Sequence, residues 1–417
     1  MDPVREQYET LPYPFRDPAD ESKRLIATTP SEPAEIDHYL FRGRRDWSKP
    51  FRVLSAGGGT GDATVNMAQR LADGGCPAEI HYLDMSTASR AIAEARIKAR
   101  GLDNVTFHTG DLLTAPDLGQ FDYIDCCGVL HHLPDPDAGF QALASALAPG
   151  GGMGIMVYAL HGRSGVYQLQ DAFRRMLPDN LAPGDQLRLA KSIMEALPDS
   201  NLLKRNPYLS AWRIDDTEFY DLLLHSRDRA YTVEQLDKTL KAVGLEIVEF
   251  PYSALYDPVG FIGAEQRPLL DTMSKLERYA LGELLRGDIT KHTFYAASKE
   301  ETDGRVATGK EANAVPRFKV TSTEFIAREI ADHGRILADV GAIRFTLSVP
   351  HETALAVAVA GDGRSLGEMA DLLGLDWMQF QSIWRPIHNV ATATGLLTYS
   401  QGMDCQLAGT ASAIEVG

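Results

Sequence analysis

Length, composition and charge limit what this chain can be. Its 417 residues, of which 44% are hydrophobic and 24% charged, suffice for two or three domains with ordinary cores. This composition excludes a wholly disordered, collagen-like or coiled-coil chain. The formal net charge of −16 argues against nucleic acid and membrane surfaces as partners, because phosphate binding needs a positive field.

The first 50 residues form a polar, proline-punctuated arm without the apolar run of a secretory signal. No stretch of the sequence reaches the ~18 apolar residues of a membrane-spanning helix. Four cysteines, Cys76, Cys126, Cys127 and Cys405, lack metal-binding spacing, and we interpret them as reduced core thiols. We therefore expect a soluble cytoplasmic protein without a metal site.

From residue 51 onward, apolar runs of strand length alternate with helical patterns. The runs cover 51–56, 79–85, 104–110, 121–130 and 152–160, and most of them are separated by helix-like segments. This alternation predicts βαβ units, and hence an α/β fold with a parallel sheet and helices on both of its faces.

Irregular helical patterns then follow, and the α/β unit closes later in the chain. A helix over 232–244, strands over 245–250 and 292–299, and a helix over 268–285 are predicted. The stretch 301–315 has few large apolar residues, which is typical of a linker. The predicted organisation is an arm (1–50), an α/β domain (51–300) with a helical insertion at about 160–230, a linker (301–315) and a carboxyl-terminal module (316–417).

The carboxyl-terminal module resembles a small winged-helix unit, with a helix, a turn, a helix and a strand over 362–400. A helix that reads DNA needs several Lys or Arg residues, but 376–390 contains one, Arg385. Large apolar side chains dominate this helix instead: Trp377, Met378, Phe380, Ile383 and Trp384. We expect the module to form a homodimer or to present a polypeptide substrate, and not to bind nucleic acid.

A glycine-rich turn, AGGGTGD, joins the first strand to the first helix of the α/β domain. Gly57, Gly59 and Gly61 allow a ligand to approach the backbone closely. Asp84 ends the next strand, where a carboxylate can accept both hydroxyls of a ribose, and Asp111 follows the third strand. All lie at carboxyl ends of parallel strands, so we expect a nucleoside cofactor; the alternative is a purely structural turn.

The motif excludes two common nucleotide folds. GxxxxGK[ST] is absent, and Asp62 stands where the last glycine of GxGxxG would be. The segments VLSAGGGTG, HYLDMS, FHTGDLL, FDYIDCCGVLHHLPDP and LAPGGGMGIMVY resemble class I S-adenosylmethionine-dependent methyltransferases in order and spacing. The resemblance covers residues 51–160, and the strands at 245–250 and 292–299 are similar to the reversed finish of that seven-stranded sheet.

The resemblance implies a cofactor, S-adenosylmethionine, and a product, S-adenosylhomocysteine. It assigns the cofactor's binding to the following residues: Gly57, Gly59 and Gly61 at the methionine part, Asp84 and Met85 at the ribose, Asp111 and Leu112 at the adenine, and Gly128 at the methyl group. The family often has an acidic residue two positions before its first glycine, facing the methionine amino group. This chain has Ser55 there, which leaves the anchoring of that end open.

The acceptor site is less clear from the sequence. His131 and His132 follow the fourth strand, and one of them is a candidate base; the alternative is that they cap a helix or pack against the cofactor. Tyr8, Tyr13 and Phe15 could fold over the cofactor as an aromatic lid, or belong to an arm packed on the sheet edge. Five further residues are candidates for the acceptor pocket: Tyr158, Arg163, His225, Arg229 and Tyr231.

The predicted function is methyl transfer to an N, O or S nucleophile of a small molecule. One alternative is a protein or peptide side chain as the acceptor, since a chain of charge −16 attracts basic polypeptides. A second alternative is a catalytically silent regulator that binds the cofactor only to sense it and has the carboxyl-terminal module as its output.

Overall fold

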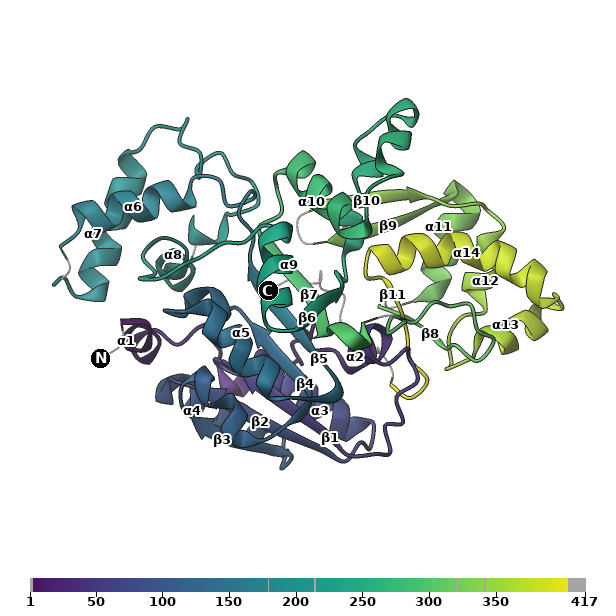
Figure 1. Ribbon diagram of the computed structural model, residues 1–417, viewed down its shortest axis with the longest axis horizontal. Helices are drawn as coiled ribbons and strands as arrows, with labels where there is room; N and C mark the ends of the chain where they lie inside the picture. Colours follow the sequence, from purple (N-terminus) through teal and green to yellow (C-terminus); the bar gives the residue numbers. More distant parts are fainter. Residues whose placement is uncertain are drawn as a thin grey trace.

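The computed structural model describes residues 3–178, 180–213, 215–302, 304–319, 322–340 and 343–403, so Cys405 lies outside it. Seven strands form one sheet in the order β3-β2-β1-β4-β5-β7-β6 (Figure 1). They are β1 (Phe51–Ala56), β2 (Ala78–Asp84), β3 (Val105–Thr109), β4 (Phe121–Cys127), β5 (Leu147–Tyr158), β6 (Leu245–Glu249) and β7 (Lys291–Ser298). Strand β7 runs antiparallel to both β5 and β6, and the other pairs are parallel. The predicted α/β class and the reversed last strand are confirmed.

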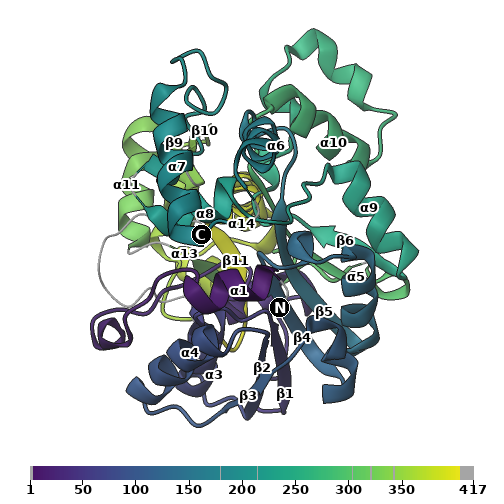
Figure 2. The same ribbon diagram turned by 90° about the vertical axis from the view of Figure 1, so that its left-hand side faces the viewer.

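Helices cover both faces of the sheet (Figure 2). One face carries α2 (Pro33–Leu40), α3 (Asp62–Asp73) and α4 (Thr87–Ala99), and the other carries α5 (Pro136–Ser145), α9 (Val233–Ala242) and α10 (Lys275–Arg286). Successive side chains of a strand point to opposite faces, so Val53 enters the core with α3 and Leu54 the core with α5. Across the described ranges, no helix combines the length and apolar character that crossing a bilayer requires.

Two segments rise above the carboxyl edge of the sheet. The insertion forms α6 (Val166–Met176), α7 (Pro183–Ala196) and α8 (Asp216–Leu223), which share a small core of their own. The amino-terminal helix α1 (Pro3–Thr10) lies between α4 and α8 in both ribbon views (Figures 1 and 2). Side-chain hydrogen bonds tie it to both, from Thr87 to Glu9 and from Tyr8 to Asp221.

The carboxyl-terminal module lies beside the α/β domain (Figure 1). Its elements are β8 (Pro316–Phe318), α11 (Thr323–His333), β9 (Arg335–Val340), β10 (Ile343–Ser348), α12 (Thr353–Ala358), α13 (Leu366–Leu373), α14 (Trp377–Ala393) and β11 (Leu397–Tyr399). The hairpin β9–β10 precedes the helix-turn-helix α13–α14, and β11 pairs with β8. Phe380 and Trp384 of α14 are buried in the core of the module, whereas Met378 is 82% exposed.

Helix α2 joins the module to the α/β domain, because all its residues are buried. The Ser400 hydroxyl donates to Asp37 Oδ2 at 2.6 Å, and the Tyr399 amide donates to His38 Nδ1 at 3.1 Å. The segment predicted as a linker contributes as well: the Ala307 amide donates to the His38 carbonyl, and Arg305 donates to the Leu40 carbonyl. Arg305 and Ala307 are therefore held against α2.

The Ser400–Asp37 bond gives a test of this junction. Burial raises the pKa of Asp37 to about 6, although three hydrogen bonds favour its charged form. Ser400→Ala removes one of these donors from a buried carboxylate, and we expect it to lower the free energy of unfolding by about 1–3 kcal/mol. Urea denaturation measures this loss. Ser145→Ala, at an exposed site in α5, is the control and should change stability by less than about 0.5 kcal/mol.

Candidate active site

A cavity of about 800 Å³ lies at the carboxyl edge of the sheet. This volume is in the upper part of the range of ~300–1,000 Å³ for ligand pockets, so there is room for more than one small ligand. Among the residues predicted for the cofactor, all but Gly61 line it: Ser55, Gly57, Gly59, Asp84, Met85, Asp111, Leu112 and Gly128.

The glycine turn is shaped by close backbone approaches. Gly57 (φ +73°) and Gly59 (φ +52°) adopt left-handed conformations that favour glycine. A Cβ on Gly57 would lie 2.3 Å from a methyl carbon of Val129, and one on Gly59 would lie 3.0 Å from the Tyr13 carbonyl oxygen. Gly61 has a different structural role, because a Cβ there would collide with Ala93 of α4. It allows two helices to pack and does not face the cavity.

Asp84 binds the glycine turn with its carboxylate. Its Oδ2 accepts the Gly59 N–H at 2.8 Å, and its Oδ1 accepts the Ser86 N–H at 2.8 Å. Burial raises the pKa of Asp84, and these backbone bonds oppose the shift. Each oxygen keeps a lone pair for a further donor, so the carboxylate can still accept two ligand hydroxyls.

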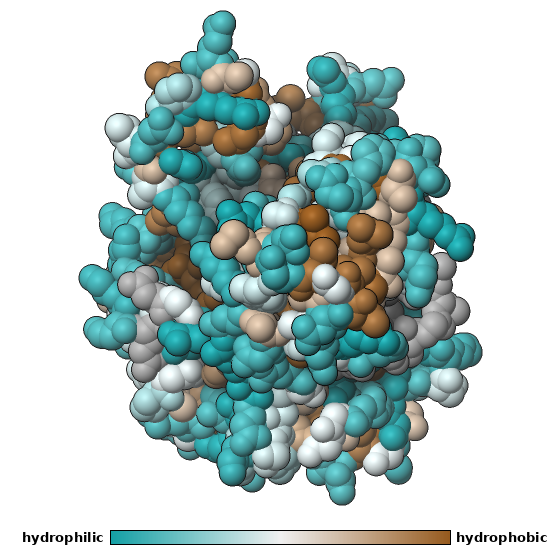
Figure 3. Space-filling model, turned by 90° about the vertical axis from the view of Figure 1, so that its right-hand side faces the viewer, coloured by the Kyte–Doolittle hydropathy of each residue, from teal (hydrophilic) through white to brown (hydrophobic). Residues whose placement is uncertain are grey.

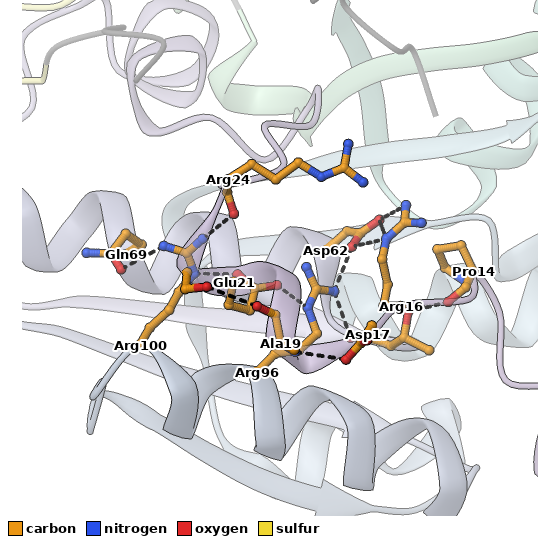
Figure 4. Close-up of polar contacts among 12 residues, drawn as sticks. Pro14, Arg16, Asp17, Ala19, Glu21, Arg24, Asp62, Gln69, Arg96 and Arg100 are labelled. Carbon is orange, nitrogen blue, oxygen red and sulfur yellow. Dashed lines mark hydrogen bonds and ion pairs between the residues drawn. The ribbon is translucent and has the colours of Figure 1, made fainter. Parts of the chain in front are cut away.

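The arm is fastened to the same turn by a network of ion pairs (Figure 4). Asp62 directly follows the turn and pairs with Arg16 of the arm at 2.6 Å and with Arg96 of α4 at 2.7 Å. Arg96 is 1% exposed and also binds Glu21 of the arm at 2.5 Å. Since a buried cation needs its partners, this network fixes the path of the arm over the turn.

Two of the three aromatic residues predicted for a lid face the cavity. The Tyr13 hydroxyl donates to Glu218 Oε1 at 3.0 Å, and the Tyr8 hydroxyl lies 3.4 Å from Asp221 Oδ1. Phe15 departs from the prediction: it is 72% exposed and does not line the cavity. Its neighbours in the sequence, Pro14 and Arg16, do line the cavity.

The two adjacent histidines occupy different environments. His132 lines the cavity, and its Nδ1 lies 2.7 Å from the Arg227 carbonyl oxygen. A carbonyl can only accept, so Nδ1 carries the proton and Nε2 of the neutral ring keeps a lone pair. His131 does not line the cavity, is 1% exposed and has no hydrogen-bond partner for either ring nitrogen within the described residues. Burial lowers the pKa of His131 and keeps it neutral.

Asp221 of α8 sits beside His132. It accepts the Tyr158 hydroxyl at 2.8 Å. Burial would raise the pKa of Asp221, but any positive charge on the nearby imidazoles, the hydrogen bond from the Tyr158 hydroxyl and the Arg163 guanidinium lower it overall, so the group is a carboxylate. An anion here stabilises a positive charge that develops on the neighbouring imidazole.

Comparison with known proteins identifies the domain. Residues 54–153 match a family model described as a methyltransferase domain. The α/β core is a class I S-adenosylmethionine-dependent methyltransferase domain. The uncharacterized protein syc1184_c of Synechococcus sp. is 35% identical over 252 residues, which are 58% of this chain and 59% of that protein. The ubiquinone biosynthesis O-methyltransferase of Stutzerimonas stutzeri is 27% identical over 146 residues, 35% of this chain and 58% of that enzyme. The chain thus spans less than two thirds of the length of these relatives.

The fold likeness reaches beyond the methyltransferase domain. PKMT2 from Rickettsia typhi, whose structure is known in complex with AdoHcy, is similar with a TM-score of 0.63 and 15% identity. The similarity covers 89% of this chain and 76% of that chain, so it must include part of the carboxyl-terminal module.

The residues of the methyltransferase domain fit its cofactor, S-adenosylmethionine. Gly57 and Gly59 line the cavity, and the absence of side chains there lets Val129 and the Tyr13 carbonyl pack directly against the turn. Asp84 offers its carboxylate to a ribose, and Asp111, whose Oδ1 accepts the Leu113 N–H at 2.9 Å, stands at the next strand end for an adenine. These three features lie along one wall of the cavity.

The remaining predicted acceptor residues divide into near and distant groups. Tyr158 and Arg163 line the cavity, and Arg163 forms a buried ion pair with Asp228 at 3.0 Å. His225 stacks on His132 with ring centroids 3.7 Å apart. Arg229 pairs with Asp137, and the buried Tyr231 packs near Phe140, so neither residue belongs to the cavity wall.

His132, Asp221 and His225 have donor atoms within 4.8 Å of one another, a grouping that could hold a metal ion. The hydrogen bonds favour a different use. The Arg227 N–H donates to His225 Nδ1 at 3.1 Å, which places the proton of neutral His225 on Nε2. Burial lowers the pKa of His225 to about 3, so the ring stays neutral. The group is therefore better suited to proton transfer than to metal binding.

The sequence alone missed several residues of the cavity wall. They are Thr28, Asp125, Glu218, Asp221 and Lys291. The Lys291 side chain has no hydrogen bond or ion pair with any described residue, and burial lowers its pKa although Glu218 opposes the shift. Asp125 carried a signal that could have been used, because it is a charged residue in the middle of a strand whose neighbouring positions are mostly buried. The others come from segments whose approach to the cavity depends on tertiary structure.

Binding of S-adenosylhomocysteine tests the cofactor end. Asp84→Ala removes the acceptor of two hydroxyl hydrogen bonds, each worth about 1.5–3 kcal/mol, so we expect its affinity to fall by about 100-fold or more. Gly59→Val should have a similar effect, because its side chain meets the Tyr13 carbonyl. Isothermal titration calorimetry measures both, with Asp103→Ala at an exposed site as control. Affinities within threefold of the wild type for both variants would contradict this site.

Limited proteolysis tests whether the arm closes the cavity. Chymotrypsin can cut after the exposed Phe15 only when the arm detaches from the turn. Because Tyr8 and Tyr13 line the cavity, a bound ligand should hold the arm down and slow this cleavage. We expect S-adenosylhomocysteine to slow it at least about fivefold, and to leave cleavage after Phe261 unchanged. Equal rates with and without the ligand would show that the arm is not a lid.

Proposed function

We propose that the protein transfers a methyl group to a proton-bearing nucleophile, a hydroxyl in the first place, of a small polar molecule. The observation that carries this proposal is His132, which lines the cavity and whose Nδ1 lies against the Arg227 carbonyl, so that the neutral ring has its lone pair on Nε2. Its Nδ1–H is held by the Arg227 carbonyl, which fixes both the tautomer and the orientation of the ring.

The chemistry is divided between cofactor and chain. When bound, S-adenosylmethionine supplies a methyl group on a sulfonium and leaves as S-adenosylhomocysteine. His132 takes the proton of the acceptor as the oxygen–carbon bond forms, and Asp221 stabilises the resulting imidazolium. Tyr8 and Tyr13 exclude water and hold the acceptor in line with the methyl group.

The walls of the acceptor end support a small molecule. They come from segments far apart in the chain: the arm with Tyr13, α8 with Glu218, β7 with Lys291, and Val340 and Ile343 of the β9–β10 hairpin. Carboxylates and an ammonium group together recognise a polar acceptor. The relatives named as ubiquinone biosynthesis and magnesium-protoporphyrin O-methyltransferases favour oxygen as the atom methylated.

The predicted homodimer stays a prediction. The carboxyl-terminal module exposes Phe325, Leu355, Leu372 and Met378. Figure 3 faces that end of the molecule and shows apolar side chains gathered among polar ones. A homodimer through the module would cover such side chains, and the absence of nucleic acid partners likewise stays a prediction.

Transfer of a radioactive methyl group tests the proposal. The protein is incubated with methyl-labelled S-adenosylmethionine and with either the low-mass or the protein fraction of a cell extract. We expect labelled product in the low-mass fraction, and a loss of at least about 100-fold with His132→Asn, since general-base catalysis contributes about 10²–10⁴. His333→Asn, at an exposed site of α11, should retain full activity.

The two fractions separate the alternatives. Label found only in polypeptide would overturn the small-molecule acceptor, and His132→Asn with unchanged turnover would overturn the base. No label in either fraction, despite cofactor binding, would favour a silent regulator.

A further inference from the structure

The missing acidic residue of the glycine motif has a counterpart on the neighbouring strand. Ser55 of β1 stands where related domains often carry a carboxylate for the methionine amino group. In the sheet, Ser55 is the direct partner of Asp125 on β4. Both residues line the cavity, so the carboxylate of Asp125 lies next to the position where β1 lacks one.

Asp125 has unfilled capacity for a hydrogen bond. It is 3% exposed, and its Oδ2 accepts the Ser31 hydroxyl at 2.6 Å and lies 3.9 Å from Cys127 Sγ. Among the described residues, no side chain donates to Oδ1, and no Lys or Arg pairs with the carboxylate. A buried carboxylate without a cation is costly, which indicates a site for a positively charged ligand group.

A second polar atom nearby is also without a partner. The Thr28 hydroxyl is buried, lines the cavity and has no hydrogen bond within the described chain. Thr28 and Ser31 belong to the segment that leads into α2, and the Asn66 amide of α3 fixes this segment by donating to the Ser31 carbonyl at 2.9 Å. The Thr28 hydroxyl can donate to a carboxylate, and the Asp125 carboxylate can accept from an ammonium group. Together they match the two charged groups of an amino acid.

The corner lies at the cofactor end of the cavity. Ser55 lies two residues before Gly57. The residues of the acceptor end lie elsewhere: His132 follows β4, Tyr158 is the last residue of β5, and Asp221 belongs to α8. The Thr64 hydroxyl, in the first turn of α3, donates to Ser55 at 2.9 Å, which ties Ser55 to the helix that the glycine turn begins. The ammonium group that reaches this corner is therefore that of the cofactor and not that of an acceptor.

We propose that Asp125 binds the ammonium group of the methionine part of S-adenosylmethionine, with the Thr28 hydroxyl donating to its carboxylate. The anchor is thus supplied by β4 in place of β1. Burial raises the pKa of Asp125 to about 6, and a bound ammonium group would favour the charged carboxylate. The inference rests on the assignment of the cofactor and not on the identity of the acceptor.

Two ligands that differ only at the methionine part provide the test. S-Adenosylhomocysteine carries the amino acid, whereas 5′-methylthioadenosine keeps the adenosine and the sulfur but lacks it. With Asp125→Asn, we expect calorimetric affinity for S-adenosylhomocysteine to fall about 10- to 100-fold, as for a lost charged hydrogen bond. Affinity for 5′-methylthioadenosine should stay within twofold of the wild type. Asp84→Asn is the matched control and should weaken both ligands.

Moving the carboxylate back to β1 gives a second, independent variant. The double variant Ser55→Asp with Asp125→Ser moves the carboxylate from β4 to its strand partner on β1. We expect this variant to bind S-adenosylhomocysteine at least tenfold more tightly than Asp125→Asn does. Equal weakening of both ligands by Asp125→Asn, or no weakening of either, would overturn the anchor and leave Asp125 a structural role with Ser31. Failure of both ligands to bind the wild type would instead contradict the cofactor assignment.

Discussion

The close approach of three segments at Gly59 is the constraint on which the rest of the site depends. The Gly59 N–H donates to Asp84 at the end of β2, its carbonyl accepts the Tyr82 hydroxyl at 2.7 Å, and the Tyr13 carbonyl oxygen of the arm lies 3.0 Å from where a Cβ would be. The left-handed φ of +52° and this close contact both favour glycine. The turn after β1 therefore brings the Asp84 carboxylate, the glycine backbone and the aromatic arm together, and we propose that this arrangement binds the ribose and the methionine part of the cofactor.

The acceptor end is built on the same edge from less local contacts. Because β4, β5 and the reversed β7 bring His132, Tyr158 and Lys291 to that edge, the α/β domain provides half of the wall. The insertion adds Glu218 and Asp221, the arm adds Tyr8 and Tyr13, and the carboxyl-terminal module adds its hairpin. Helix α2, buried between the module and the sheet, joins the module to the α/β domain beside this site.

The sequence predicted what depends on local pattern and on order along the chain. The strands of the sheet, the glycine turn, Asp84 and Asp111 were all accessible, because strand periodicity and motif spacing place them at one edge. Asp221, Glu218 and Lys291 were not, since their roles depend on how an insertion and a reversed strand fold back. The linker at 301–315 stays a prediction: its composition does not reveal the hydrogen bonds that the Ala307 amide makes to α2 and that the Ala312 and Ala314 carbonyls make to the carboxyl-terminal module.

A crystal structure of the protein with S-adenosylhomocysteine tests the central claim most directly. The account predicts the ribose at Asp84, the adenine beside Asp111 and Leu112, and the sulfur facing Gly128, with an open path from the sulfur to His132 Nε2. A ligand bound outside this cavity, or one whose sulfur points away from His132, would contradict it.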